Sequence, residues 1–285
     1  MQLLSFDLDG AGRIGVRAGN EVVDLTATGL PARMETFLAL GEEGLAAARK
    51  ALTSGAKRLP FVGLKLRSPV ISPAKAIAVG LNFVDHAAES DKPVPTYPVL
   101  FHRYPSSWVG PGESLVAPGA SAQYDYEGEM VIVIGKGGRD IDKARALEHV
   151  AGYSVFNEGC ARDFQMKSSQ WMMGKNFDRS GGFGPWITTA DELPPGAKGL
   201  RLRTRLNGQT VQDASTDDMI FDVATLVAVC SVPFALVPGD IIIAGTPAGV
   251  GVSRKPQLFM KPGDVCEVEV EGIGTLSNPV IAQRG

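Results

Sequence analysis

The sequence predicts a mainly β protein of the α+β class, and three observations carry this prediction. The continuous apolar run from Met130 to Ile134 is typical of a buried strand. Asn207-Gly208 stands between two strand-like segments and indicates a two-residue β-hairpin. Pro-Gly-Asp turns at Pro238 and Pro262 each precede a further strand-like run. Because few segments show helical periodicity, we expect sheets with a small number of helices.

The N-terminal stretch predicts a small α/β unit. Strands are expected at Leu3 to Phe6, Ile14 to Val16 and Val22 to Leu25, and helices at Pro31 to Leu40 and Leu45 to Ala51. Prolines 60, 69 and 73 then rule out a continuous helix. We therefore place a boundary near residue 70, with a small N-terminal domain over residues 1–70 and a larger second domain over residues 71–285.

Two helices and two strands are expected in the second half of the chain. Asp142 is a suitable N-cap for a helix that runs through Val150, and a uniformly apolar helix is expected from Met219 to Cys230. The runs after the Pro-Gly-Asp turns, Ile241 to Ile243 and Val265 to Val270, indicate strands.

Composition excludes several classes of protein. Of the 285 residues, 44% are hydrophobic and 21% are charged, which is ordinary for a globular chain, and the 34 glycines indicate many turns. The 28 basic and 31 acidic residues give a net charge of −3 without a basic run, which argues against binding of nucleic acid or an anionic membrane. The apolar stretch from Val223 to Gly239 contains two prolines and is too short to span a membrane.

The N-terminus and the cysteines predict a location. The first ten residues lack a basic segment followed by an apolar one, so we expect no signal peptide. Three distant cysteines without a CxxC pair argue against disulfides and zinc, and favour the cytoplasm. Nucleotide chemistry is not expected either, because the glycines from Gly245 to Gly251 have the wrong order for a dinucleotide loop and the sequence holds no P-loop, GxSxG or HExxH pattern.

An acidic cluster precedes the apolar run at Met130. If Asp125, Glu127 and Glu129 belong to one strand, alternation puts all three side chains on the same face. Like charges at the head of a buried strand are costly unless a cation or a proton offsets them. A divalent ion such as Mg²⁺ or Mn²⁺ would do so. The motif alone leaves open a second interpretation, in which the strand end is hydrated.

Two further groups could join this site. Glu158, after the next strand, could supply a third oxygen ligand, although this segment taken alone favours a surface turn with Arg162 paired to Asp163. His86 and Glu89 lie at positions i and i+3, so on a helix they would share a face and could take a proton from water. An exposed ion pair is the alternative.

Five segments in order resemble the fumarylacetoacetate hydrolase family. They are GLNFVDHAAE from Gly80, YDYEGEMVIVIGK from Tyr124, GYSVFNEGCARDFQ from Gly152, GKNFDRSGGFGPW from Gly174 and PGDIIIAGTPAGVG from Pro238. The resemblance implies a mixed β-roll built on a folded β-sandwich, with a smaller N-terminal domain and commonly a homodimer.

The resemblance also implies roles for individual residues. Glu127 and Glu129 would bind Mg²⁺ or Mn²⁺ together with Glu158, at a position where the family usually has aspartate. The catalytic residues would be His86, Glu89 and Lys175, and no organic cofactor is expected. The residues expected to bind substrate are Arg162, Gln165 and Thr246. Arg103, close to two serines, is a weaker candidate for a distal substrate carboxylate.

These roles predict a metal-dependent hydrolase that cleaves the C–C bond of an acylpyruvate or fumarylpyruvate-type 2,4-dioxo acid in small-molecule catabolism. The alternatives on the same site are oxaloacetate decarboxylation, keto–enol tautomerisation and isomerisation of 2-hydroxyhepta-2,4-diene-1,7-dioate. A scaffold protein without activity is a further alternative. We expect specificity to lie in Asp91 to Tyr104 and in Phe177 to Trp186, with the second segment acting as a lid hinged at Ser180-Gly181-Gly182.

Overall fold

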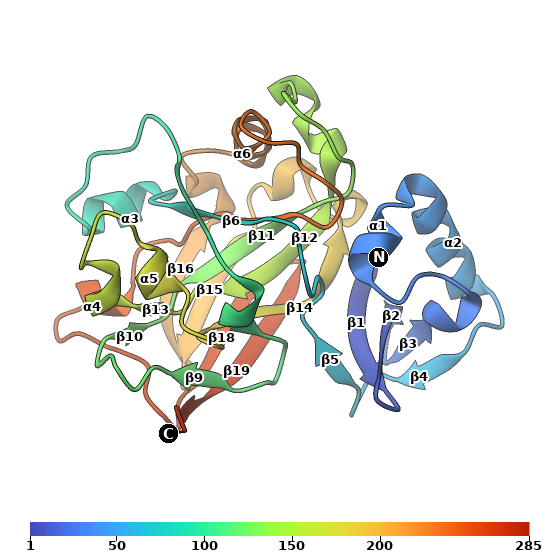
Figure 1. The fold of residues 1–285 in the computed structure, drawn as a ribbon, viewed down its shortest axis with the longest axis horizontal. Coiled ribbons are helices and arrows are strands. Elements are labelled where there is room, and N and C mark those ends of the chain that lie inside the picture. The colour runs from blue at the N-terminus through green and yellow to red at the C-terminus, as the bar shows by residue number, and fades with distance from the viewer. Residues whose placement is uncertain (285) are drawn as a thin grey trace.

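A computed structural model describes residues 1–284, and one large mixed sheet runs through that part of the chain (Figure 1). Its twelve strands are β1 Gln2–Leu8, β2 Ala11–Ala18, β3 Glu21–Asp24, β4 Arg58–Pro60, β5 Lys65–Arg67, β6 Ala76–Gly80, β7 Val99–His102, β8 Trp108–Val109, β11 Gly128–Ile134, β12 Val150–Asn157, β14 Gly181–Thr189 and β17 Ile241–Ile243. Their order in space is β4-β3-β2-β1-β14-β12-β11-β17-β6-β7, with β5 on β1 and β8 on β14.

A second sheet packs against the large one and completes a sandwich. Its five strands, in spatial order, are β16 Gln209–Ser215, β15 Arg201–Leu206, β18 Val265–Val270, β19 Gly274–Ala282 and β9 Leu115–Ala117. One core cluster joins Met130 and Ile132 of the large sheet to Leu202 and Val268 of the second. The hairpin expected at Asn207-Gly208 links β15 to β16, and both turn residues have positive φ, 53° and 79°. The mainly β, α+β class is confirmed.

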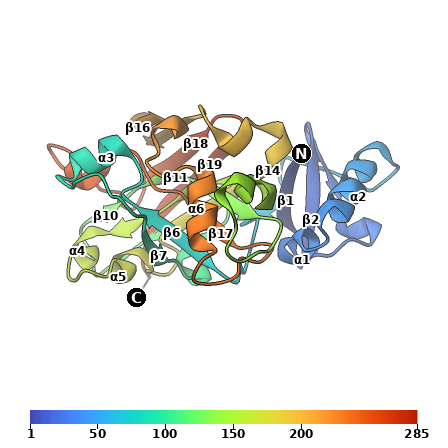
Figure 2. The same cartoon turned by 90° about the horizontal axis from the view of Figure 1, so that it is seen from above.

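Helices are short and lie around the sheets. They are α1 Met34–Leu38, α2 Gly41–Thr53, α3 Val84–Glu89, α4 Arg162–Gln165, α5 Met172–Lys175 and α6 Val223–Cys230. Short 3-10 helices lie at Thr26–Thr28, Pro105–Ser107, Lys143–His149, Ala190–Glu192, Pro195–Ala197, Thr216–Asp218 and Gly251–Ser253. Figure 2 shows α6 over the face of the large sheet near β17. No helix among residues 1–284 is long and apolar enough to cross a membrane.

The two helices expected in the second half differ from the structure in detail. The segment after Asp142 is a 3-10 helix rather than an α-helix, although Asp142 does cap it by accepting from the Ala144 N–H at 2.9 Å. The apolar helix begins at Val223, not Met219, because Asp222 caps it through the Thr225 N–H at 2.8 Å.

The N-terminal 70 residues extend the large sheet. β1 pairs antiparallel with β14, with Gln2 opposite Thr188 and Leu3 opposite Ile187. Leu3 also belongs to one buried cluster with Phe156 and Phe183 of the remaining chain. Figure 1 accordingly shows the blue N-terminal strands continuing from β14. The domain boundary near residue 70 stays a prediction, but the two parts share a sheet and a core.

The acidic segment is not one strand, contrary to the sequence prediction. β10 Tyr124–Asp125 pairs with β13 Cys160–Ala161, and β11 begins only at Gly128. Between them, the Glu127 N–H donates to Asn157 Oδ1 at 3.2 Å and its carbonyl accepts from the Glu158 N–H at 2.7 Å. Gly128 permits the close approach of the two sheets here, since a Cβ would lie 2.0 Å from Thr204 Oγ1. Asp125 and Glu129 therefore belong to different strands.

The lid predicted at Phe177 to Trp186 is also wrong for most of its length. From Gly181 onward the segment is β14, which is buried throughout and lies between β1 and β12 in the large sheet. A strand hydrogen-bonded on both sides cannot open without breaking the sheet. The three glycines of this strand allow close packing rather than hinge motion: at Gly182, a Cβ would lie 2.4 Å from Asn278 Oδ1.

We predict that the intact chain unfolds in a single cooperative transition. The shared β1–β14 pairing and the shared core cluster couple the first 70 residues to the rest. Differential scanning calorimetry measures this directly. Two separate heat-absorption peaks would contradict it and would favour two independently stable domains.

Candidate active site

A cavity of about 300 Å³ opens beside the end of the large sheet, where α3, α4 and α5 surround it. It contains eight of the ten residues that the sequence predicted for the site, namely His86, Glu127, Glu129, Glu158, Arg162, Gln165, Lys175 and Thr246. Glu89 contacts the cavity through His86, and Arg103 lies behind Glu158. The structure thus gathers residues that are up to 160 positions apart in the chain.

Three buried carboxylates form the floor of this cavity. Glu127, Glu129 and Glu158 each offer an oxygen, and these oxygens lie within 4.8 Å of one another. The pairing of β11 with β12 explains the meeting point, because Gly128 stands opposite Asn157 and so brings their neighbours Glu127 and Glu158 together. The Glu129 carboxylate is held by the Gly245 N–H, which donates to Oε2 at 2.5 Å.

This arrangement fits a hard divalent cation. Burial, and then the charges of Glu158 and Glu127, hold the pKa of Glu129 well above its usual value. Burial also raises the pKa of Glu158, and its Oε1 atom accepts no hydrogen bond from the described residues. Three carboxylate oxygens, one of them without a donor, are the ligands that Mg²⁺ and Mn²⁺ prefer.

Lys175 balances part of this negative charge. Its Nζ donates to Glu127 and, at 2.8 Å, to Glu158. Burial alone would lower the pKa of Lys175, but these two carboxylates raise it above its usual value, so the amine is an ammonium at neutral pH. Conversely, burial would raise the pKa of Glu127, but Lys175 and Arg162 hold it at about 2. The third proton of the ammonium is available to a ligand in the cavity.

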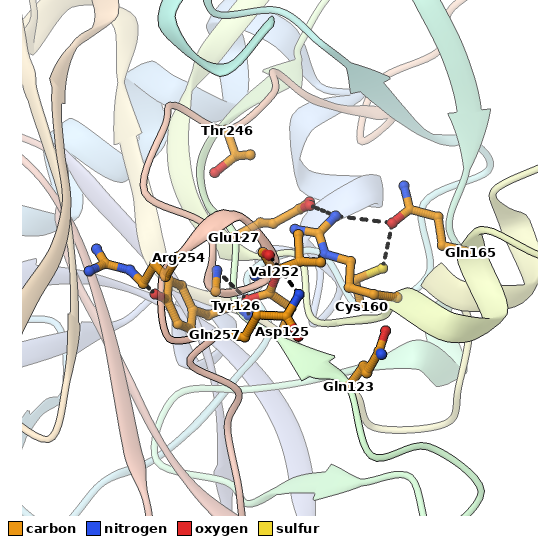
Figure 3. Close-up of polar contacts among 12 residues, drawn as sticks. Gln123, Asp125, Tyr126, Glu127, Cys160, Gln165, Thr246, Val252, Arg254 and Gln257 are labelled. Atoms are coloured by element: carbon orange, nitrogen blue, oxygen red, sulfur yellow. Dashed lines mark hydrogen bonds and ion pairs between the residues drawn. The ribbon is translucent and has the colours of Figure 1, made fainter. Parts of the chain in front are cut away.

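Arg162 is already engaged by the protein. Its Nε donates to Asp125 Oδ2 at 2.8 Å, and its Nη1 lies 2.7 Å from Glu127 Oε1 and donates to Gln165 Oε1 at 3.0 Å (Figure 3). Only Nη2 has no hydrogen-bond partner among the described residues. The substrate binding expected for Arg162 therefore stays a prediction, and Nη2 is the nitrogen available for it.

The His86–Glu89 pair forms as helical spacing predicts. Both residues lie on α3, and His86 Nδ1 is 3.3 Å from Glu89 Oε2. The other carboxylate oxygen of Glu89 accepts from the Gly249 N–H at 2.9 Å, which fixes the acid in place. Gly249 has φ 102°, and a Cβ there would lie 2.2 Å from the Val211 carbonyl oxygen, so this contact requires glycine.

Sequence reasoning missed Gln212, which organises the loop that carries Thr246. The Gln212 side chain is buried, accepts from the Gly128 N–H at 2.9 Å, and donates to Thr246 Oγ1 at 2.8 Å. Thr246 in turn donates to the Gly128 carbonyl at 3.0 Å, so its hydroxyl proton is not free for substrate. Gln212 lies in β16, the edge strand of the second sheet, whose mostly polar sequence QTVQDAS gave no signal of this role.

The structure places Arg103 elsewhere than predicted. Its guanidinium is buried behind Glu158, where Nη1 donates to the Gly159 carbonyl at 3.2 Å and lies 4.0 Å from Glu158 Oε1. Nε donates to Ser107 Oγ at 3.0 Å. Burial lowers the pKa of Arg103, and Glu158 opposes that shift. Rather than meeting a distal carboxylate in the cavity, Arg103 holds the turn that carries the third carboxylate of the cluster.

Comparison with known proteins gives consistent matches. The family model described as "Fumarylacetoacetate (FAA) hydrolase C-terminal" matches residues 75–281. A mitochondrial oxaloacetate tautomerase of Xenopus laevis is 41% identical over 94% of this chain and 86% of its own. The structure of a fumarylacetoacetate hydrolase from Exiguobacterium antarcticum is similar with a TM-score of 0.88, at 38% identity, over 99% of this chain and 100% of its own. A Sphingobium maleylpyruvate hydrolase, in complex with manganese(II) and pyruvate, has a TM-score of 0.84 at 29% identity, with 100% of both chains covered.

We predict that Glu129→Gln weakens binding of Mn²⁺ by more than about tenfold, because the neutral amide removes one charge from the carboxylate cluster. Isothermal titration calorimetry on protein prepared without chelator measures the affinity. The matched control is Glu148→Gln, at a half-exposed glutamate paired with Arg145, which should bind Mn²⁺ like the wild type. Equal affinities of the two variants would exclude the carboxylate cluster as the metal site.

We also predict that Arg103→Met weakens Mn²⁺ binding about tenfold, because the turn that carries Glu158 loses the hydrogen bond from Arg103 to the Gly159 carbonyl that fixes its position. Arg103→Lys, which keeps a donor, should lose less. Calorimetric titration is paired here with thermal unfolding, because a residue that only stabilises the fold would lower Tm and leave the Mn²⁺ affinity of the folded protein unchanged.

Proposed function

Because this chain belongs to the fumarylacetoacetate hydrolase family, we propose that it is a divalent-metal-dependent enzyme that interconverts the enol and keto forms of oxaloacetate. One observation carries the proposal: a cluster of three carboxylates, a protonated lysine and a histidine–glutamate pair line one small cavity. The 41% identity to an oxaloacetate tautomerase over nearly the whole chain supports this choice among the family's reactions.

Glu127, Glu129 and Glu158 would hold Mg²⁺ or Mn²⁺, which supplies a Lewis acid that binds the 2-oxo acid group and draws electrons from its carbonyl. The chain's own residues then position the substrate and move protons. Arg162 Nη2 has no hydrogen-bond partner among the described residues, and the Lys175 ammonium has one proton more than its contacts with Glu127 and Glu158 use. Both favour an anionic oxygen at this end of the substrate.

His86 is suited to move the proton at C3. With its Nδ1–H donated to Glu89, Nε2 carries the lone pair that can accept a proton. Converting keto to enol removes one proton from C3 and adds one to the oxygen on C2, for which the ammonium of Lys175 in the cavity lining is the proposed donor. The reverse reaction returns both protons, so no atom is gained or lost overall. Glu89, fixed by Gly249, keeps the ring oriented through the cycle.

The hydrolysis of a 2,4-dioxo acid, favoured by sequence reasoning, remains the second candidate. The same His86–Glu89 pair can take its proton from water instead of from C3, which would start attack on the carbonyl and cleavage of the C–C bond. The structural similarity to a maleylpyruvate hydrolase supports this alternative, although the sequence identity is 29%, against 41% for the oxaloacetate tautomerase. A homodimer and a cytoplasmic location stay predictions, and the curated relative is a mitochondrial protein.

We predict that His86→Ala lowers the rate of enol–keto exchange of oxaloacetate by about 10²–10⁴-fold, as expected for loss of a general base. The ultraviolet absorbance of the enol follows the reaction in the presence of Mn²⁺. His102→Ala, at an exposed histidine outside the cavity lining, is the control and should match the wild type. A wild-type protein that hydrolyses acylpyruvates while leaving oxaloacetate exchange at its spontaneous rate would favour the second candidate.

A further inference from the structure

The cavity lining holds a cation that the proposed chemistry does not use. Lys92 lines the same cavity as Glu127, Glu129 and Glu158, yet it is exposed to solvent whereas these carboxylates are buried. Lys92 therefore stands at the mouth of the cavity and the carboxylate cluster at its floor. Two serine hydroxyls, of Ser90 and Ser253, line the cavity as well.

The backbone at Lys92 is fixed to the helix that carries His86. The Lys92 N–H donates to the Ala87 carbonyl at 3.0 Å, and the Asp91 N–H donates to the Ala88 carbonyl at 3.1 Å. Asp91 has φ 50°, in the left-handed region. This combination is the Schellman motif that ends α-helices. Pro93 follows directly and restricts Lys92 to an extended conformation. The root of the Lys92 side chain thus has a defined position relative to His86.

The ammonium of Lys92 has no ion-pair partner among the described residues 1–284. Some exposed lysines do pair, such as Lys65 with Asp7 at 3.2 Å and Lys143 with Asp222 at 3.4 Å, whereas Lys50 of α2 is exposed and without an ion pair among these residues, like Lys92. The other two cations of the cavity, Lys175 and Arg162, are engaged by buried carboxylates. The Lys92 ammonium is consequently available to pair with an anionic ligand.

We infer that Lys92 recognises the second carboxylate of a 2-oxo dicarboxylate, and so sets the preference of the cavity for dicarboxylates over monocarboxylates. The inference rests on the proposed function for the orientation of the substrate, with the 2-oxo acid group at the carboxylate floor. The remaining carboxylate of such a molecule then lies toward the mouth. The lining of the cavity includes the apolar side chains of Leu81, Trp171 and Val250, and its cations Lys175 and Arg162 are held by buried carboxylates. Among the described lining residues, Lys92 is therefore the cation left to pair with this group.

The test compares ligands that differ only in the distal charge. Oxaloacetate and its C4 methyl ester serve as substrates, and 2-oxoglutarate and 2-oxopentanoate serve as ligands in calorimetry with Mn²⁺-loaded protein. Lys92→Met should raise KM for oxaloacetate about tenfold and leave kcat within about twofold of the wild type, and it should weaken the binding of 2-oxoglutarate by a similar factor. KM for the methyl ester and the affinity for 2-oxopentanoate should not change.

Two further variants sharpen the comparison. Lys92→Arg keeps the charge and should restore the preference for the dicarboxylate ligands. Lys50→Met removes an exposed lysine of α2 that does not line the cavity, and this variant should behave as the wild type. Equal effects of Lys92→Met on the charged and uncharged ligands of each pair, or no effect on either, would overturn the inference.

Failure of the proposed function gives a different result. If the wild type accelerates enol–keto exchange of neither oxaloacetate nor its methyl ester, the proposed reaction is wrong. The calorimetric comparison of 2-oxoglutarate with 2-oxopentanoate still tests Lys92 in that case. Selective loss of 2-oxoglutarate binding in Lys92→Met then supports the role of Lys92 for another reaction of a 2-oxo dicarboxylate. Unchanged binding in that variant overturns it.

Discussion

The mutual repulsion of three buried carboxylates is the constraint on which the rest of this site depends. Glu127, Glu129 and Glu158 have oxygens within 4.8 Å of one another, away from bulk water. Such a cluster is stable only if cations and hydrogen-bond donors offset it. Lys175 and Arg162 do so for Glu127, while the pKa of Glu129 stays well above its usual value. The remaining deficit of positive charge is the reason why we propose the cluster as a binding site for a divalent ion.

The sandwich supplies the geometry that this constraint requires. Paired strands β11 and β12 bring Glu127 and Glu158 together, and the break before Gly128 turns Glu127 out of the ladder toward Lys175. Each adjustment relies on a close approach that a side chain would block, as at Gly159, where a Cβ would lie 1.8 Å from the Ser180 carbonyl oxygen. The high glycine content of the sequence is explained in part by these positions, where a neighbouring segment leaves no room for a Cβ atom.

Much of the fold and of the site's membership could be predicted from the sequence, because local patterns encode them. Alternation and turn residues predict the hairpin at Asn207-Gly208, and helical spacing predicts that His86 meets Glu89. The two predictions that the structure contradicts, a single acidic strand and a lid, were wrong because of contacts between distant parts of the chain. The strand through Asp125 breaks because Asn157 and Glu158 bind its backbone, and the glycines after Ser180 belong to a central strand because β1 arrives from the other end of the chain. Neither contact leaves a local signal.

On the proposed function, the division between floor and mouth would let one site serve several reactions. Any 2-oxo acid could present the same pair of oxygens to a divalent ion held by Glu127, Glu129 and Glu158, so this part of the cavity would activate substrates without distinguishing them. Proton transfer by His86 would be equally general, since water and an acidic C–H are both within the chemistry of an imidazole. Discrimination must then arise from groups that touch the rest of the molecule. We propose that in this chain Lys92 is such a group, because it lines the cavity and follows α3, the helix that carries His86, after a turn fixed by backbone hydrogen bonds. A change at that turn would alter which acid is accepted and leave the activating floor intact.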